Sequence, residues 1–242
     1  MEIDELAEKL SSWITIKVKE AGCRGAVFGL SGGIDSSVVA VLSKQVVGDN
    51  VLGILNPCHS IPQDEEHARA IAEKFSIATH KIVLDTAFDI LSGLLPDNPV
   101  DEAAARIAVA NLKARLRMVT WYHFANQLRY LVVGSSNRSE LTIGYFTKYG
   151  DGGVDILPLG NLVKTQVREL AGYLGVPREI IEKPPSAGLW EGQTDEGDLG
   201  FTYEQLDSFL LTGETEAAAR QKIESMIAKS GHKTKSPPLP PF

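Results

Sequence analysis

The stretch that decides the fold is Leu30-Ser31-Gly32-Gly33-Ile34-Asp35-Ser36-Ser37, which follows an apolar run at residues 25–30. The apolar run predicts a buried strand, and the residues after the glycines predict a helix over residues 36–47. Two adjacent glycines let the chain turn tightly and approach a ligand closely. This glycine loop, residues 30–37, is therefore expected at the carboxyl end of a strand, where open α/β sheets bind their ligands.

The glycine loop also has the chemistry of an anion site. Free N–H groups at the start of the following helix point at an anion, and the hydroxyls of Ser31, Ser36 and Ser37 add donors. Asp35 suits a phosphate only with a cation between them, which favours a magnesium ion held by Asp35 and phosphate oxygens. The alternative is an ordinary Gly-Gly turn with Asp35 or Ser36 as helix cap. Neither a Walker A motif nor a G-x-G-x-x-G fingerprint is present here.

Strand and helix patterns alternate outward from this loop. Strands are expected at residues 25–30, 51–55, 77–84 and 130–133, and helices at residues 3–18, 36–47, 63–75, 101–127, 165–174 and 215–229. This alternation predicts an α/β fold, a doubly wound and mostly parallel sheet with helices on both faces. We expect one domain over residues 1–242, with a proline-rich tail from about residue 234. Residues 183–200, rich in glycine, proline and acids, are expected to form a long loop that acts as a lid.

Charge and composition narrow the function classes. The 242 residues carry 24 basic and 31 acidic side chains, a net charge of −7, which excludes a whole-surface nucleic-acid binder. No apolar run reaches the roughly 18 residues of a membrane span. The two cysteines, Cys23 and Cys58, are too few for a disulfide framework. With an acidic N-terminus that lacks a signal-peptide pattern, the expectation is a cytoplasmic protein without nucleic-acid or membrane partners.

Four later stretches, together with the glycine loop, identify a family. The Ser-Gly-Gly-x-Asp-Ser pattern resembles the PP-loop of the ATP pyrophosphatase superfamily. The later stretches are Asn111-Leu112-Lys113-Ala114-Arg115-Leu116-Arg117-Met118, Gly134-Ser135-Ser136-Asn137-Arg138-Ser139-Glu140, Gly144-Tyr145-Phe146-Thr147-Lys148-Tyr149-Gly150-Asp151-Gly152-Gly153-Val154-Asp155, and Lys183-Pro184-Pro185-Ser186-Ala187-Gly188-Leu189-Trp190 running into Gln193-Thr194-Asp195-Glu196. In this order they resemble the ammonia-dependent NAD synthetases. The resemblance spans roughly residues 3–235 and implies an adenine nucleotide α-hydrolase-like fold.

The resemblance also implies site residues. It places ATP on Gly29, Leu30, Ser31, Gly32, Gly33, Ile34, Asp35, Ser36, Ser37, Ser135, Lys164 and Ser186. It places deamido-NAD on Arg115, Lys148, Asp151, His232 and Lys233, and Mg²⁺ on Asp35 and Glu140. Asp35 and Lys164 are the implied catalytic residues. Taken singly, Glu140 could equally be a charge at a helix start, whereas Arg115, Lys148, Asp151, His232 and Lys233 would each more often be solvated surface residues.

The implied reaction joins ammonia to deamido-NAD at the expense of ATP, through an acyl-adenylate, in a homodimer with its active site near the interface.

The sequence departs from the family pattern at the expected adenine contact. Residues 56–60 contain no arginine, whereas some relatives have an adenine-contacting arginine there. Two arginines two positions apart on a helix point to different sides, so one of Arg115 and Arg117 is expected to reach a pocket and the other to be solvated.

Three alternatives stay open at this point. The chain could be another PP-loop amidating or thiolating enzyme, the synthetase subunit of a glutamine-dependent pair, or a non-catalytic nucleotide sensor that keeps the fold. The acidic balance disfavours a tRNA substrate. Neither cysteine lies in a recognisable amidase context, which favours free ammonia over glutamine as nitrogen source.

Overall fold

The computed structural model describes residues 2–96, 98–190 and 192–242. Met1 and Glu191, which belong to the acidic N-terminus and the expected lid, lie outside the described residues. The strands are β1 (Gly25–Gly29), β2 (Val51–Leu55), β3 (Thr79–Lys81) and β4 (Tyr130–Val132). The helices are α1 (Ile3–Glu20), α2 (Ile34–Val47), α3 (Pro62–Lys74), α4 (Asp85–Leu94), α5 (Glu102–Leu128), α6 (Arg138–Ile143), α7 (Lys164–Tyr173), α8 (Arg178–Ile181), α9 (Asp195–Leu199), α10 (Tyr203–Thr212) and α11 (Ala217–Ser230).

The four strands form one parallel sheet in the order β3-β2-β1-β4. Ala26 of the central strand β1 is paired with Val51 of β2 on one side and with Leu131 of β4 on the other. The chain order reverses between β1 and β4, which makes that edge a topological switch point. The predicted α/β class with a parallel sheet is confirmed, and the switch point fixes where ligands are expected.

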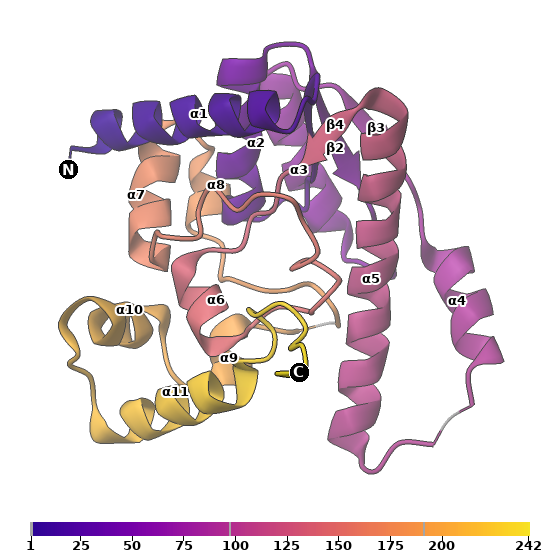
Figure 1. Cartoon of the computed structure of the whole chain (residues 1–242), viewed down its shortest axis with the longest axis vertical. Coiled ribbons are helices and arrows are strands. Elements are labelled where there is room, and N and C mark those ends of the chain that lie inside the picture. Colours follow the sequence, from indigo (N-terminus) through magenta and orange to yellow (C-terminus); the bar gives the residue numbers. More distant parts are fainter. Residues whose placement is uncertain (1, 97, 191) are drawn as a thin grey trace.

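Helices cover both faces of the sheet because β1 is apolar on both. Phe28 and Leu30 face a core shared with α1, α2, α3 and α7, whereas Val27 packs with Trp121 and Ala125 of α5. In Figure 1, α5 runs as a long rod along one side of the molecule with α4 outside it. This double coverage explains why the strand reads as a continuous apolar run.

A separate apolar cluster lies in the later third of the chain. It joins α6, α10 and α11 through buried side chains that include Ile143, Tyr203, Leu206 and Ile223. Figure 1 shows α10 and α11 at the end of the molecule far from α1. The sequence predicts only α11 of these three helices, so this second small core is a finding of the structure.

Several predicted boundaries need correction. The helix expected from residue 36 begins at Ile34, and the strand expected over residues 77–84 is only the short edge strand β3. Residues 195–199 of the expected loop 183–200 form α9. The α4 helix was not predicted. No helix among the described residues is long and apolar enough to cross a membrane.

Candidate active site

The glycine loop is held in shape by its own serines. Ser36 Oγ and Ser37 Oγ both donate to the carbonyl of Gly33, at 2.9 and 2.8 Å, and Ser31 Oγ lies 3.0 Å from Ser36 Oγ. Gly33 N–H donates to Ser31 Oγ at 3.3 Å. These bonds fix the loop at the N-terminus of α2, where free N–H groups and the helix dipole suit a phosphate.

Gly32 has to be a glycine on two counts. Its φ is +78°, a conformation that other residues rarely adopt. A Cβ at this position would lie 2.1 Å from the backbone oxygen of Asp64 at the start of α3. The glycine loop therefore packs directly against α3, with no space for a side chain between them.

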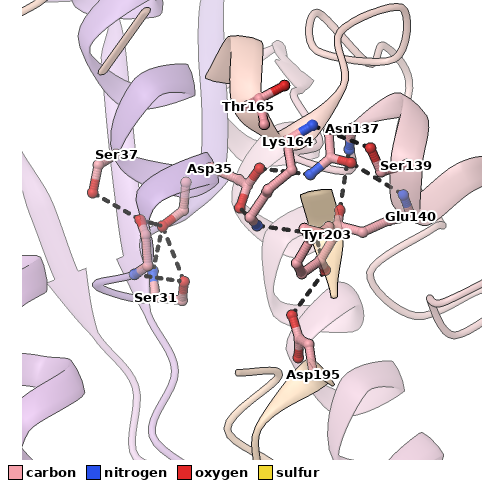
Figure 2. A network of polar contacts seen from close by, with 12 residues as sticks. Ser31, Asp35, Ser37, Asn137, Ser139, Glu140, Lys164, Thr165, Asp195 and Tyr203 are labelled. Carbon is pink, nitrogen blue, oxygen red and sulfur yellow. Dashed lines mark hydrogen bonds and ion pairs between the residues drawn. The ribbon is translucent and has the colours of Figure 1, made fainter. Parts of the chain in front are cut away.

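One lysine lies between two carboxylates beside the loop. Lys164 Nζ at the start of α7 is 2.5 Å from Asp35 Oδ2 and 3.3 Å from Glu140 Oε1. Asn137 Nδ2 donates to the other oxygen of Asp35 at 2.8 Å. Figure 2 shows these side chains converging from α2, α6 and α7, with Tyr203 of α10 beneath them. Residues that are far apart in sequence thus form one charged cluster.

Burial sets the charge states in this cluster. Desolvation and the charge of Asp35 raise the pKa of Glu140 well above its usual range, although Lys164 opposes the shift. Desolvation by itself would lower the pKa of Lys164, but Asp35 and Glu140 outweigh it and the pKa is raised. The lysine therefore stays a cation, and both acidic side chains contact it.

Two residues without an assigned role hold Lys164 in place. Asp207 of α10 accepts the Ser139 hydroxyl at 2.5 Å and the Thr165 N–H at 2.8 Å. Ser139 Oγ in turn accepts the Lys164 N–H at 3.1 Å. These hydrogen bonds attach the first turn of α7 to α6 and α10, so the backbone position of Lys164 beside the cluster is fixed.

The cluster opens into a cavity of about 830 Å³. That size lies in the usual range of ligand sites. Thirteen of the residues implied by sequence line it, namely Gly29, Leu30, Ser31, Gly33, Ile34, Asp35, Ser36, Ser135, Glu140, Asp151, Lys164, Ser186 and Lys233. They come from both sides of the β1–β4 switch point and from the lid.

The described part of the expected lid, residues 183–190 and 192–200, is called the lid segment here; it contributes side chains to the cavity wall and is attached at a few points. Lys183 Nζ is 2.5 Å from Asp64 Oδ1, and the buried Lys113 of α5 donates to the Leu189 carbonyl at 2.9 Å. The Arg106 guanidinium lies 5.4 Å from the centre of the Trp190 ring. The lid segment thus bridges α3 and α5 across the cavity.

The cation preference of the cluster can be judged from its ligands. Asp35 and Glu140 converge on a single ammonium group, so their oxygens are close enough to share one cation. Among the described residues, no group of three or more His, Cys, Asp or Glu side chains could hold a metal. Two carboxylates fit Mg²⁺, because it keeps several waters and takes its other ligands from phosphates.

Comparisons with known proteins agree with this geometry. The NAD synthase family model matches residues 6–237. The NH(3)-dependent NAD(+) synthetase of Carboxydothermus hydrogenoformans is 51% identical, over 98% of this chain and 97% of its own. The chain belongs to the NAD synthase family.

Two solved structures share the fold over nearly the whole chain. The NMN synthetase from Francisella tularensis has a TM-score of 0.93 at 37% identity and covers 100% of both chains. The NH3-dependent NAD synthetase from Campylobacter jejuni has a TM-score of 0.82 at 28% identity and covers 99% of both chains. The NAD synthase fold is thus present from end to end.

Three of the implied dinucleotide contacts in this NAD synthase chain lie together but do not line the cavity. The exposed Arg115 donates to the Lys148 carbonyl at 3.3 Å, and Lys148 Nζ donates to the His232 carbonyl at 2.7 Å. Asp151 and Lys233 do reach the cavity. Asp151 Oδ1 accepts the Thr147 N–H at 2.9 Å, and burial raises the pKa of the Asp151 carboxyl.

Two of the implied ATP contacts, Gly32 and Ser37, do not line the cavity. The Ser37 hydroxyl instead donates to the Gly33 carbonyl within the glycine loop.

Of the pair Arg115 and Arg117 on α5, Arg117 is the one that lines the cavity. It donates to the Asn56 carbonyl at 3.2 Å and to Ser60 Oγ at 3.2 Å. Arg115 is the exposed one. An arginine therefore does reach the loop after β2, from a distant helix rather than from residues 56–60. Spacing on α5 showed that the two arginines diverge but could not show which one turns inward.

Proposed function

We propose that this chain catalyses the ATP-dependent amidation of deamido-NAD by ammonia, giving NAD, AMP and pyrophosphate. The observation that carries the proposal is Lys164 held between Asp35 and Glu140 next to a preformed glycine loop. Relatives named NH(3)-dependent NAD(+) synthetase, at 51 and 48% identity over nearly the full chain, support the same activity.

The glycine loop is proposed to hold the phosphates of ATP. Its backbone N–H groups at the α2 N-terminus and its serine hydroxyls provide donors, and Ser135 and Ser186 line the same cavity. Asp35 and Glu140 would hold a magnesium ion, which neutralises phosphate charge and orients the leaving pyrophosphate. In this proposal Lys164 exchanges part of its contact with the carboxylates for contact with the phosphates.

The reaction itself needs no covalent protein nucleophile. The carboxylate of the nicotinic acid ring attacks the α-phosphorus of ATP, and the bond to pyrophosphate breaks. Ammonia then attacks the acyl carbon, AMP leaves, and a proton is lost from nitrogen. Lys164 stabilises the negative charge that develops on the phosphates. The lid segment, fastened by Lys113 and Lys183, keeps water from hydrolysing the adenylate.

Deamido-NAD is proposed to extend from the cavity toward the surface. Asp151 and Lys233 line the cavity, and Arg115, Lys148 and His232 continue from them as a hydrogen-bonded chain. These five residues would contact the dinucleotide along its length. Such an extended path suits a substrate with two nucleotide halves.

A homodimer in the cytoplasm completes the proposal. Exposed apolar side chains occur on α4 and α5, among them Ile90, Leu94, Ile107 and Val119, each more than half exposed. In the proposed homodimer, a second copy of the chain would cover these side chains. Both cysteines carry free thiols, in keeping with a reducing compartment. Sedimentation equilibrium is expected to give twice the mass of the chain.

A second candidate substrate is nicotinate mononucleotide. The Francisella tularensis protein with a TM-score of 0.93 is an NMN synthetase, and NMN is the amide of that mononucleotide. Both reactions use the same ring carboxylate and differ only in whether an adenylate half is attached. The residues outside the cavity, Arg115, Lys148 and His232, would then have no substrate to bind.

The deciding assay supplies Mg-ATP with deamido-NAD or with nicotinate mononucleotide, and ammonium or glutamine as nitrogen source. We expect kcat/KM to be highest for deamido-NAD with ammonium. A preference for the mononucleotide would favour the second candidate. Pyrophosphate release that depends on neither substrate, or no pyrophosphate release at all, would contradict both candidate functions.

A further inference from the structure

One buried carboxylate in the cavity wall lacks a full set of partners. Asp195, the first residue of α9, is 4% exposed and lines the cavity. Its Oδ2 accepts the Tyr203 hydroxyl at 2.9 Å, but its Oδ1 has no hydrogen-bond partner among the described residues. Figure 2 shows Asp195 below Tyr203, next to the Lys164 cluster. A buried carboxylate oxygen without a partner is costly, so it calls for a ligand or another explanation.

The groups around Asp195 supply more acceptors than donors. The Tyr145 hydroxyl donates to Asp198 Oδ2 at 2.9 Å, and Gln193 Nε2 donates to the same oxygen at 2.8 Å. Each phenol has a single proton, and both protons are used on carboxylates, so the phenol oxygens have only lone pairs left. Tyr145, Gln193, Asp195 and Asp198 all line the cavity. Together with Tyr203 they form what we call the acceptor recess.

The acceptor recess also lacks a cation of its own. The cation beside it, Lys164, is engaged with Asp35 and Glu140. Burial raises the pKa of Asp195, which is the expected response of a carboxylate that lacks a sufficient counter-charge. The recess therefore offers negative charge and lone pairs to a small positive group with several N–H donors.

We propose that the acceptor recess binds the ammonium ion that supplies nitrogen to the reaction, with Asp195 as its main ligand and the phenol oxygens of Tyr145 and Tyr203 beside it. This inference rests on the proposed amidation. Ammonium carries one charge and four N–H donors and is close to water in size, so it matches a site with acceptors and no spare cation. Mg²⁺ matches it less well, because it dehydrates reluctantly and needs octahedral space.

The position of the recess links ammonium binding to the lid. Asp195 belongs to the lid segment, and its N–H donates to the Pro185 carbonyl at 2.9 Å. The Leu189 N–H donates to Gln193 Oε1 at 2.9 Å, so the two arms of the segment are tied together. The recess is therefore complete only when the lid segment lies on α5, which brings nitrogen to the site where water is excluded.

Bound ammonium must pass one proton to the Asp195 carboxylate before its nitrogen has a lone pair with which to attack the adenylate. The test therefore compares, in the Asp195→Asn variant, a nitrogen source that binds as a cation with one that binds uncharged. Ammonium needs a carboxylate to hold it, whereas hydroxylamine is mainly uncharged at neutral pH and displaces AMP from the same adenylate to give a hydroxamate. We expect kcat/KM for ammonium to fall about 10- to 100-fold, the usual loss of a charge-assisted hydrogen bond. The value for hydroxylamine should fall less than about threefold by the same reasoning.

Asp207→Asn is the matched control, since Asp207 is 2% exposed and holds α7 without lining the cavity. It should lower ammonium and hydroxylamine use by the same factor. If a thermal melt shows that Asp195→Asn is not folded, Tyr145→Phe replaces it. In Tyr145→Phe, kcat/KM for ammonium is expected to fall about threefold more than kcat/KM for hydroxylamine.

Two results would overturn the ammonium site. One is an Asp195→Asn enzyme whose kcat/KM for ammonium stays within about twofold of the wild type, and the other is an equal loss for both nucleophiles. Failure of the amidation proposal looks different, because the wild-type protein would then form neither NAD nor a hydroxamate from deamido-NAD and Mg-ATP.

Discussion

The glycine loop and the lid segment both line the cavity, yet different kinds of contact attach them to the rest of the protein. The loop is fixed by bonds among its own residues and by the close approach of Gly32 to α3. The lid segment depends on side chains from elsewhere, Lys113 of α5 and Asp64 of α3. If the glycine loop holds phosphates as proposed, the difference predicts that this site exists before substrate binds and that the lid segment can be released.

The two regions meet at Asp64. Its backbone oxygen packs against Gly32, and its carboxylate pairs with Lys183. A change in the loop therefore disturbs the position of α3, whereas a change in the lid segment removes only one bond from it. The comparison predicts large effects for loop variants and smaller ones for lid variants.

The largest effect is expected for Gly32→Ala. The new Cβ would need to occupy space 2.1 Å from the Asp64 oxygen, in a conformation with φ of +78°. We expect NAD formation to fall at least about 100-fold, with a stability loss of about 2 kcal/mol or more in urea unfolding.

Gly48→Ala is the control for Gly32→Ala. Gly48 has a φ of +62° but nothing within 4 Å of its Cβ position, so it tests the strain without the clash. It should cost about 1 kcal/mol and leave kcat unchanged. Equal effects at both positions would show that the contact with α3 is unimportant.

The next effect concerns the charge that the preformed site presents. Asp35→Asn removes one of the two carboxylates that hold Lys164 and would hold magnesium. Turnover with Mg-ATP is expected to fall about 100- to 1,000-fold, comparable to the loss of one electrostatic group from a catalytic site. Calorimetric titration of magnesium into the protein with a non-hydrolysable ATP analogue should show weaker magnesium binding in Asp35→Asn than in the wild type. Wild-type rates in Asp35→Asn would mean that the metal assignment is wrong.

A smaller effect is expected from loosening the lid segment. Lys183→Met removes its ion pair with Asp64, which is only partly exposed. We expect KM for ATP to rise about threefold to tenfold and the segment to be cut faster by protease, with little change in the melting temperature. Lys44→Met, which removes an ion pair with Asp49 outside the cavity, is the control and should change neither readout. If Lys183→Met lowered kcat as much as Asp35→Asn does, the lid segment would contribute to catalysis as directly as the glycine loop, and the comparison between the two regions would be wrong.

The smallest effect concerns how α3 is held. Glu65 pairs with Arg69 and with Lys81 of β3, and these bonds hold the pKa of Glu65 below its usual 4.5. Its stabilising contribution is therefore present above pH 4.5 and lost as the pH falls through the lower, folded-state pKa. Glu65→Gln should lose about 0.5 kcal/mol at pH 7, and the loss should shrink as the pH falls below 4.5. Urea unfolding at a series of pH values checks this, and a loss that does not change with pH would contradict the ion-pair explanation.

The sequence predicted the sheet well because its signals are local. The strand at Val51–Leu55 agrees to the residue, and the helices α1 and α5 agree within two residues. Each reads as an apolar run or as a long helical pattern bounded by recognisable ends. Most of the short helices were missed because four to ten residues give little periodicity, although α7 was predicted, and Thr202 and Gln205 form a capping box that could have indicated α10.

The site residues show the same difference between local signals, which the sequence contains, and contacts across the fold, which it does not. Asp35 and Glu140 lie in the quoted motifs, Lys164 is implied by the family resemblance, and the structure brings all three into one cluster. Asn137 and Tyr203 were not singled out, because their roles depend on contacts across the fold that no spacing reveals. The individual ligand assignments remain proposals that the variants above address.

The ion pair between Lys164 and Asp35 has a consequence for how the protein acquires activity. The two residues are 129 positions apart, so during synthesis the glycine loop leaves the ribosome long before its lysine exists. Contacts over such sequence distances form late, since they carry a large entropic cost of chain closure. Recovery of activity after dilution from denaturant should therefore lag behind recovery of helical signal, and the lag measures the last stage of folding.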